Sequence, residues 1–145
     1  MIFKQVFDTK SSTYTYIIAS AKGREAVIID PVIENVESYI SLLNELDLKL
    51  VKVIDTHIHA DHITGASKLK QATNCSTLMG EHTPADAVEI KVKDEEIIKI
   101  DQIEIKAMYT PGHTSDSYSF LMDNCLFSGD TLSVSYTHLT LPTKA

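Results

Sequence analysis

Apolar and polar residues alternate in several short runs along the chain, the pattern expected of β-strands that bury one face. The runs are rich in β-branched and aromatic residues, which favour strands, and short polar stretches separate neighbouring runs. Three pairs of runs predict three β-hairpins, at 13–18 with 26–29, at 98–100 with 103–107, and at 118–121 with 125–127. Much of the sheet is therefore expected to come from hairpins.

A different period runs from residue 33 to residue 46, where apolar side chains recur every three or four positions with acids between them. The apolar positions are Val36, Ile40, Leu43 and Leu46. This spacing predicts an amphipathic helix with one buried stripe. An apolar run at 50–54 follows, so that strand 26–29, the helix and this strand form a βαβ-like unit. A short helix at 65–73 and a small strand at 76–79 come next.

Composition limits the class of protein without changing this picture. The 145 residues, 43% of them hydrophobic, suit one globular domain with a single core. A formal net charge of -7 leaves no basic face for a phosphate backbone, so nucleic acid is not expected as a partner. No apolar run approaches the roughly 20 residues that span a bilayer, and no secretory or transit segment is expected.

The two cysteines, Cys75 and Cys125, lack CxxC spacing and have apolar neighbours. Neither a zinc knuckle nor a disulfide framework is therefore predicted, and both thiols are expected to be buried structural residues. A cytoplasmic location fits this use of cysteine, because the cytoplasm is reducing.

The densest group of titratable residues comes directly after the apolar strand at 50–54. His57, His59, Asp61 and His62 fall within six positions of one another. Alternate residues at a strand end point the same way, so His57 and His59 are expected to share a direction. Imidazole with carboxylate suits zinc, iron or manganese, and no cysteine lies nearby to form a thiolate site. The competing interpretation is a polar surface loop, but groups this close are costly without a cation.

Two later strand ends also present ligand-type side chains. His113 follows a Pro-Gly pair, which predicts a tight turn after the strand at 103–107. Asp130 follows the apolar strand at 125–127. Each signal is weak alone, but three strand ends that each deliver a ligand are typical of a site built on loops above a rigid sheet.

Three short motifs, in this order, resemble the successive motifs of the metallo-β-lactamase fold superfamily. They are the HxHxDH run at 57–62, the GHT at 112–114 and the SGD at 128–130. The resemblance covers residues 1–132. It implies an α/β protein with a four-layer αβ/βα sandwich, incomplete at the C-terminus, and a metal site at the edge of the two sheets.

For dinuclear members of that superfamily, the resemblance implies two neighbouring metal positions. One metal would be held by His57, His59 and His113, the other by Asp61 and His62, with Asp130 bridging them. A further histidine near the family's C-terminus completes the second position, and this chain has no counterpart, because His138 lies in an unpatterned tail.

Within the superfamily, residues 12–16 and the extended run 57–65 look most like the persulfide dioxygenases, relatives of glyoxalase II. This resemblance implies one non-haem Fe(II) per chain. Its ligands would be His57, His113 and Asp130, with His59, Asp61 and His62 surrounding them. Two histidines and one carboxylate leave positions open for a persulfide sulfur and dioxygen. The implied substrate is a small thiol persulfide, such as that of glutathione, which is oxidised to sulfite.

Two other functions stay open. A glyoxalase II-type hydrolase would hold two Zn(II), or a mixed zinc and iron pair, and would cleave a glutathione thioester with a shared hydroxide. Asp61 would then be a metal ligand with a catalytic role, because it would position that hydroxide. The third alternative is a metal-binding module without turnover, since the family pattern stops at Leu132 and residues 133–145 are expected to be a non-native tail. The oligomeric state is open, a homodimer included.

Overall fold

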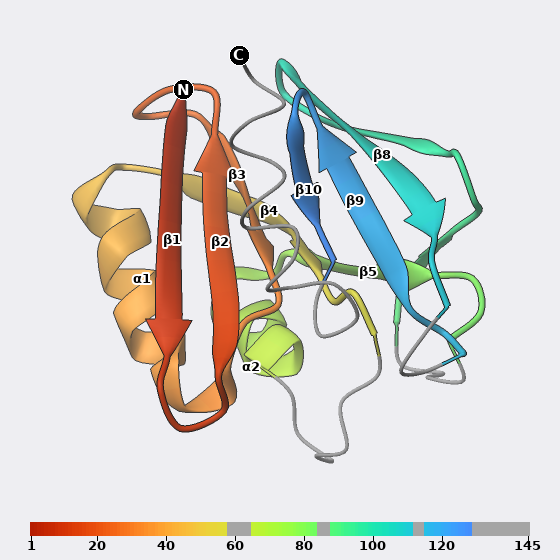
Figure 1. The fold of residues 1–145 in the computed structure, drawn as a ribbon. Coiled ribbons are helices and arrows are strands. Elements are labelled where there is room, and N and C mark those ends of the chain that lie inside the picture. Colours follow the sequence, from red (N-terminus) through yellow and green to blue (C-terminus); the bar gives the residue numbers. More distant parts are fainter. Residues whose placement is uncertain (58–64, 84–87, 112–114, 129–145) are drawn as a thin grey trace.

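Two β-sheets face each other, and helices cover the outer face of the larger sheet (Figure 1). The structure, a computed structural model, describes residues 1–57, 65–83, 88–111 and 115–128. The helices are α1 (Val36–Glu45), preceded by a 3-10 turn (Ile33–Asn35), and α2 (Gly65–Thr73). The described residues thus supply both sheets and one helical layer of the predicted sandwich.

The larger sheet has six strands in the order β1-β2-β3-β4-β5-β6. They are β1 (Ile2–Asp8), β2 (Thr13–Ala19), β3 (Glu25–Ile29), β4 (Lys49–Ile54), β5 (Ser76–Gly80) and β6 (Ile90–Val92). The first three strands pair antiparallel, and β3 to β6 pair parallel. Parallel neighbours end at the same edge of a sheet, so β3, β4 and β5 deliver their following residues to one edge.

The smaller sheet has four antiparallel strands in the order β10-β9-β8-β7. They are β7 (Ile97–Ile100), β8 (Ile103–Tyr109), β9 (Tyr118–Met122) and β10 (Cys125–Phe127). The three predicted hairpins are confirmed as β2–β3, β7–β8 and β9–β10. The predicted βαβ unit is confirmed as β3, α1 and β4.

The hydrophobic pattern does not predict β1 or β6. Strand β1 lies at the edge of the larger sheet and leaves Phe3, Lys4 and Gln5 exposed, so strict alternation is absent. It forms because it pairs with β2 along its whole length, from Ile2 with Ala19 to Asp8 with Thr13. Strand β6 has only three residues and one fully buried side chain, too few for a period to be visible.

Alternation along the central strands divides the core into two layers. Side chains of one parity fill the space between the sheets, among them Ile18, Val27, Ile29 and Ile54 from the larger sheet and Ile105, Tyr118 and Phe120 from the smaller one. Side chains of the other parity, among them Ile17, Ala26, Ile28 and Val53, pack against the helices. Both faces of the larger sheet and the inner face of the smaller sheet therefore bury apolar area, the main favourable contribution to folding.

The buried stripe of α1 differs from the predicted one. Val36 and Leu43 are buried as expected, whereas Ile40 is only half-buried and Tyr39 is 1% exposed. The Tyr39 hydroxyl lies 3.0 Å from the Thr15 hydroxyl and accepts the main-chain N–H of Val32 at 3.0 Å. These partners satisfy the phenol, so a tyrosine takes an inward position that an apolar pattern does not assign to it.

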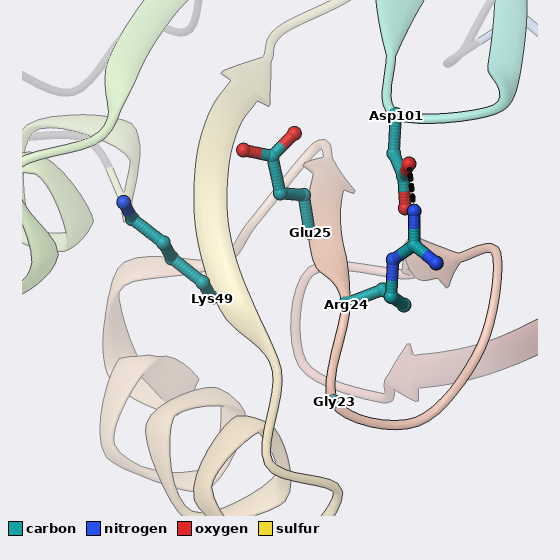
Figure 2. A pocket seen from close by; sticks show the side chains of 5 residues that line it. All are labelled: Gly23, Arg24, Glu25, Lys49 and Asp101. Atoms are coloured by element: carbon teal, nitrogen blue, oxygen red, sulfur yellow. Dashed lines mark hydrogen bonds and ion pairs between the residues drawn. The ribbon is translucent and has the colours of Figure 1, made fainter.

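Near the amino-terminal end of β3, an ion pair links the two sheets (Figure 2). Arg24 forms an ion pair with Asp101 of the β7–β8 turn, and the Ser20 hydroxyl donates to the same carboxylate at 2.7 Å. Both contacts lower the pKa of the Asp101 carboxyl below its usual range, and the Ser20 hydrogen bond has the larger effect. The ion pair lies beside a shallow surface depression. This depression is at the opposite end of the larger sheet from His57, so it is not part of the predicted site.

Replacing Asp101 with asparagine is expected to flatten the acid dependence of stability. Because the folded-state pKa lies below the unfolded value of about 3.9, the ionised carboxylate contributes stability in full above that value and loses it as the pH falls through the lower folded pKa. Asparagine tolerates the positive φ of 55° at this turn position. In urea unfolding between pH 2.5 and 6, the stability difference between the two proteins should shrink toward low pH. A difference that stays constant over this range would contradict the ion-pair explanation.

Both cysteines are free thiols, as predicted. Cys75 is buried, and burial raises the pKa of its thiol. Cys125, expected to be buried too, is half-buried, because it lies on the edge strand β10. None of the helices in the described ranges has the length and apolar character needed to cross a membrane. The predicted tail at 133–145 lies outside the described residues.

Candidate metal centre

His57 lies just beyond the carboxyl end of β4, where the chain leaves the larger sheet. The preceding residues Asp55 and Thr56 are both buried, and the Asp55 N–H donates to the Leu78 carbonyl of β5 at 3.1 Å. The strand pairing therefore continues for one residue past β4. This fixes the main chain immediately before His57.

Asp30 ties the end of β3 to the end of β4. Its carboxylate accepts the Thr56 N–H at 2.8 Å and the Thr56 hydroxyl at 2.9 Å. Asp30 is 4% exposed and has a φ of 54°, a left-handed conformation that aspartate adopts more readily than most residues. Its carbonyl accepts the Thr15 hydroxyl at 2.7 Å. These bonds hold the Asp30 carboxylate against the residue that precedes His57.

The bond from Thr56 to Asp30 also favours one tautomer of His57. The Thr56 hydroxyl has one proton, and donation of that proton to Asp30 leaves its oxygen as an acceptor. Nδ1 of His57 lies 3.0 Å from the same oxygen, so this arrangement favours the tautomer with the ring proton on Nδ1. The lone pair of the neutral imidazole is then on Nε2, the form in which a histidine binds a metal.

The smaller sheet meets the same segment. The Tyr118 N–H, at the start of β9, donates to the Thr56 carbonyl at 2.8 Å. Tyr118 pairs with Tyr109, the last residue of β8, so the end of β8 also lies at this edge. Figure 1 shows the ends of β4, β8 and β10 directed toward one side of the molecule. The strand ends that the sequence predicts to carry ligands therefore face the same side of the molecule.

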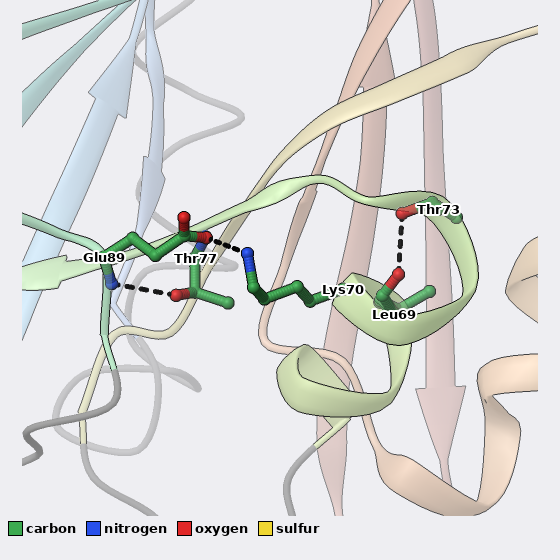
Figure 3. Close-up of polar contacts among 5 residues, drawn as sticks. All are labelled: Leu69, Lys70, Thr73, Thr77 and Glu89. Carbon is green, nitrogen blue, oxygen red and sulfur yellow. Dashed lines mark hydrogen bonds and ion pairs between the residues drawn. The ribbon is translucent and has the colours of Figure 1, made fainter.

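Helix α2, which follows the histidine run, is fixed at both ends. At its start, a side chain in place of Gly65 would put Cβ 2.7 Å from the Pro31 carbonyl oxygen, so the helix lies directly on the chain after β3. In its last turn, Lys70 forms a 2.6 Å ion pair with Glu89 (Figure 3). Glu89 and Thr77 exchange hydrogen bonds between main chain and side chain at 3.1 and 3.3 Å. The helix is thus attached to β5 and to the start of β6.

Of the predicted ligands, only His57 is among the described residues. His59, Asp61, His62, His113 and Asp130 lie outside them, so their roles remain predictions. Within the part of the chain that the structure describes, no three His, Cys, Asp or Glu side chains gather closely enough to hold a metal. The described donor nevertheless fits a metal, because the contacts of His57 favour the ligand tautomer and Nδ1 lies within hydrogen-bonding distance of the Thr56 hydroxyl.

Sequence reasoning missed the contribution of Asp30. It gave this aspartate no role, because its partner Thr56 is 26 residues away. An acid directly after a buried β-branched run was the available signal. The aromatic group of His82, Tyr109 and Tyr118 at the same edge was also missed, and no periodic pattern connects these three positions.

Comparison with known proteins agrees with this architecture. The metallo-beta-lactamase superfamily matches residues 8–142. The chain is 34% identical to the mitochondrial persulfide dioxygenase ETHE1 of Bos taurus over 135 residues, covering 91% of this chain and 53% of that protein. It is 31% identical to the hydroxyacylglutathione hydrolase of Rhodopseudomonas palustris (strain BisB18) over 132 residues, covering 88% and 51%.

The crystal structure of ETHE1 from Myxococcus xanthus superposes with a TM-score of 0.81 at 40% identity, covering 87% of this chain and 56% of that one. The chain thus spans about half the length of the relatives that it matches. The family match over most of the sequence, together with the paired sheets, establishes that this chain belongs to the metallo-beta-lactamase superfamily.

Proposed function

We propose that this chain is the metal-binding part of a persulfide dioxygenase that uses one Fe(II). The observation that carries the proposal is its identity of 34% to persulfide dioxygenase ETHE1 and of 40% to the Myxococcus xanthus ETHE1. The net reaction would convert a thiol persulfide, dioxygen and water into the thiol, sulfite and two protons. The thiol carrier would be a small molecule such as glutathione.

His57, His113 and Asp130 would hold the iron, with His59, Asp61 and His62 around them. An Fe(II) bound in this way would activate dioxygen beside the persulfide sulfur, because three protein ligands leave neighbouring positions open. Among the described residues, Asp30 and Thr56 would keep His57 oriented with Nε2 as the donor. Second-sphere contacts of this kind set both the geometry and the basicity of a ligand.

The second candidate is a hydroxyacylglutathione hydrolase, which the 31% identity to the Rhodopseudomonas palustris enzyme favours. It would use the same residues around two metal ions. Asp61 would then bind a metal and position a shared hydroxide, whose lowered pKa allows attack on a thioester carbonyl at neutral pH. The number of metals bound per chain therefore distinguishes the two functions.

The test uses protein purified without oxygen and loaded with Fe(II). Oxygen uptake with glutathione persulfide, sulfite formed in equal amount and one iron per chain are the expected results. Thioester cleavage with two metals per chain and no oxygen uptake would replace the dioxygenase by the hydrolase. One bound metal with neither activity would leave a metal-binding module without turnover.

A further inference from the structure

An aromatic cluster joins the two sheets at the edge that carries His57. The rings of His82 and Tyr109 stack with centroids 3.9 Å apart and planes 5° from parallel. Nδ1 of His82 lies 3.2 Å from the hydroxyl of Tyr118. His82 comes just after β5 of the larger sheet, whereas the two tyrosines belong to β8 and β9 of the smaller sheet. One imidazole thus contacts the ends of two strands in the opposite sheet.

Core packing does not account for this arrangement, because His82 is exposed and Tyr109 is only half-buried. Burial, followed by the nearby carboxylates of Glu81 and Asp94, raises the pKa of Tyr118 above its usual value. The phenol therefore stays neutral, and its hydroxyl can donate to Nδ1 of His82 or accept from it, according to the imidazole tautomer. The histidine is held at two points, by a ring face and by a ring nitrogen.

Tyr109 in turn holds the base of the segment that contains His113. Its hydroxyl donates to the Ser115 carbonyl at 2.7 Å, and its N–H donates to the Asp94 carboxylate at 2.8 Å. Ordinary strand pairing already joins the two sides of this segment, since the Thr110 N–H donates to the Ser117 carbonyl at 3.1 Å. The Tyr109 hydroxyl adds a bond to Ser115, which is two residues closer to His113 than Ser117, the acceptor of the Thr110 N–H.

These contacts form a continuous chain from the larger sheet to the residues that flank His113. His82 fixes the Tyr109 ring, and the Tyr109 hydroxyl fixes Ser115. Because Tyr118 also donates its N–H to the Thr56 carbonyl, the same cluster contacts the residue that precedes His57. Movement of the Tyr109 ring would therefore change the position of Ser115 relative to Thr56.

We propose that Tyr109, braced by the stacked His82, is a positioning residue that fixes the segment carrying His113 relative to His57. This inference rests on the proposed metal site. It assigns a role to residues outside the motif positions, and it predicts that the Tyr109 hydroxyl affects metal binding without touching the metal.

The test compares Tyr109→Phe, which keeps the ring stack and removes only the hydroxyl, with the parent chain. In metal-free protein, amide hydrogen exchange over residues 110–116 is expected to rise about 2- to 10-fold, the range of one net hydrogen bond. With Co²⁺ as the probe, the dissociation constant should rise by a similar factor and the visible absorption of the bound ion should change. His82→Ala should produce the same changes in the same direction.

Ser115→Ala is the matched control, because it alters the same segment and keeps the main-chain carbonyl that accepts the bond. Unchanged exchange in Tyr109→Phe would overturn the inference. Faster exchange with an unchanged Co²⁺ dissociation constant and spectrum would also overturn it, since the bond would then serve only local stability. If the parent chain bound no metal, the proposed function would fail, and exchange in the metal-free protein would still decide whether Tyr109 holds the segment.

Discussion

Replacing Asp30 with asparagine is expected to weaken metal binding by about 10- to 100-fold, the range found when a partner of a metal ligand is removed. Asparagine fits the positive φ of 54° and can still accept the Thr56 N–H through its carbonyl oxygen. Its amide nitrogen, however, would face the Thr56 hydroxyl as a donor. That hydroxyl would have to turn and donate its proton to Nδ1 of His57.

The ring proton of His57 would then move to Nε2, the atom needed for the metal. Metal binding would require the proton to return to Nδ1, and this would break the new hydrogen bond from the Thr56 hydroxyl. The affinity for the metal therefore falls, although the metal-free variant has as many hydrogen bonds as the parent. Chelator competition with Co²⁺ measures the affinity, and nitrogen NMR of the imidazole identifies the tautomer.

Asp101→Asn provides a matched control for this prediction. It makes the same chemical change at nearly the same backbone angle, φ 55°, at the opposite end of the larger sheet. It should leave the Co²⁺ dissociation constant unchanged. Equal loss of affinity in both variants, or none in Asp30→Asn, would rule out the tautomer mechanism.

Local patterns in the sequence predict most of the fold, because the apolar positions within each hairpin or helix identify the face that is buried. The runs at 98–100 and 103–107 alternate strictly, and Ile98, Ile105 and Ala107 are all buried. Patterns fail where a partner elsewhere in the chain decides the outcome. Strand β1 is one case, since pairing with β2 determines it rather than any periodicity of its own.

The candidate site divides in the same way. His57 is predictable because a ligand-type residue follows a buried strand, and this can be recognised within about ten residues of sequence. The roles of Asp30 and Tyr109 depend on which strands are neighbours and on how the two sheets face each other. A single sequence carries no local signal for such contacts, so these supporting residues become visible only in the folded structure.

Replacing Gly80 with alanine is expected to destabilise the fold by about 3 kcal/mol, the upper part of the usual range for overpacking. Gly80 ends β5, and a Cβ there would lie 1.9 Å from Cδ1 of the Tyr118 ring. The ring cannot move aside easily, because Tyr118 is 0% exposed and its N–H is bonded to the Thr56 carbonyl. Urea unfolding should measure the loss, and the melting temperature should fall by about 10 °C.

The clash between Gly80 and Tyr118 also predicts strong coupling between the two positions. Tyr118→Leu alone should destabilise the protein, because it removes a buried ring and the hydroxyl bonded to His82. In the double variant, however, the shorter leucine leaves room for the new methyl group, so the two losses should not add. A double-mutant cycle is expected to show at least about 1 kcal/mol of favourable coupling. Additive losses would mean that the Gly80 main chain moves instead of the ring, and that contact with Tyr118 does not require a glycine at the end of β5.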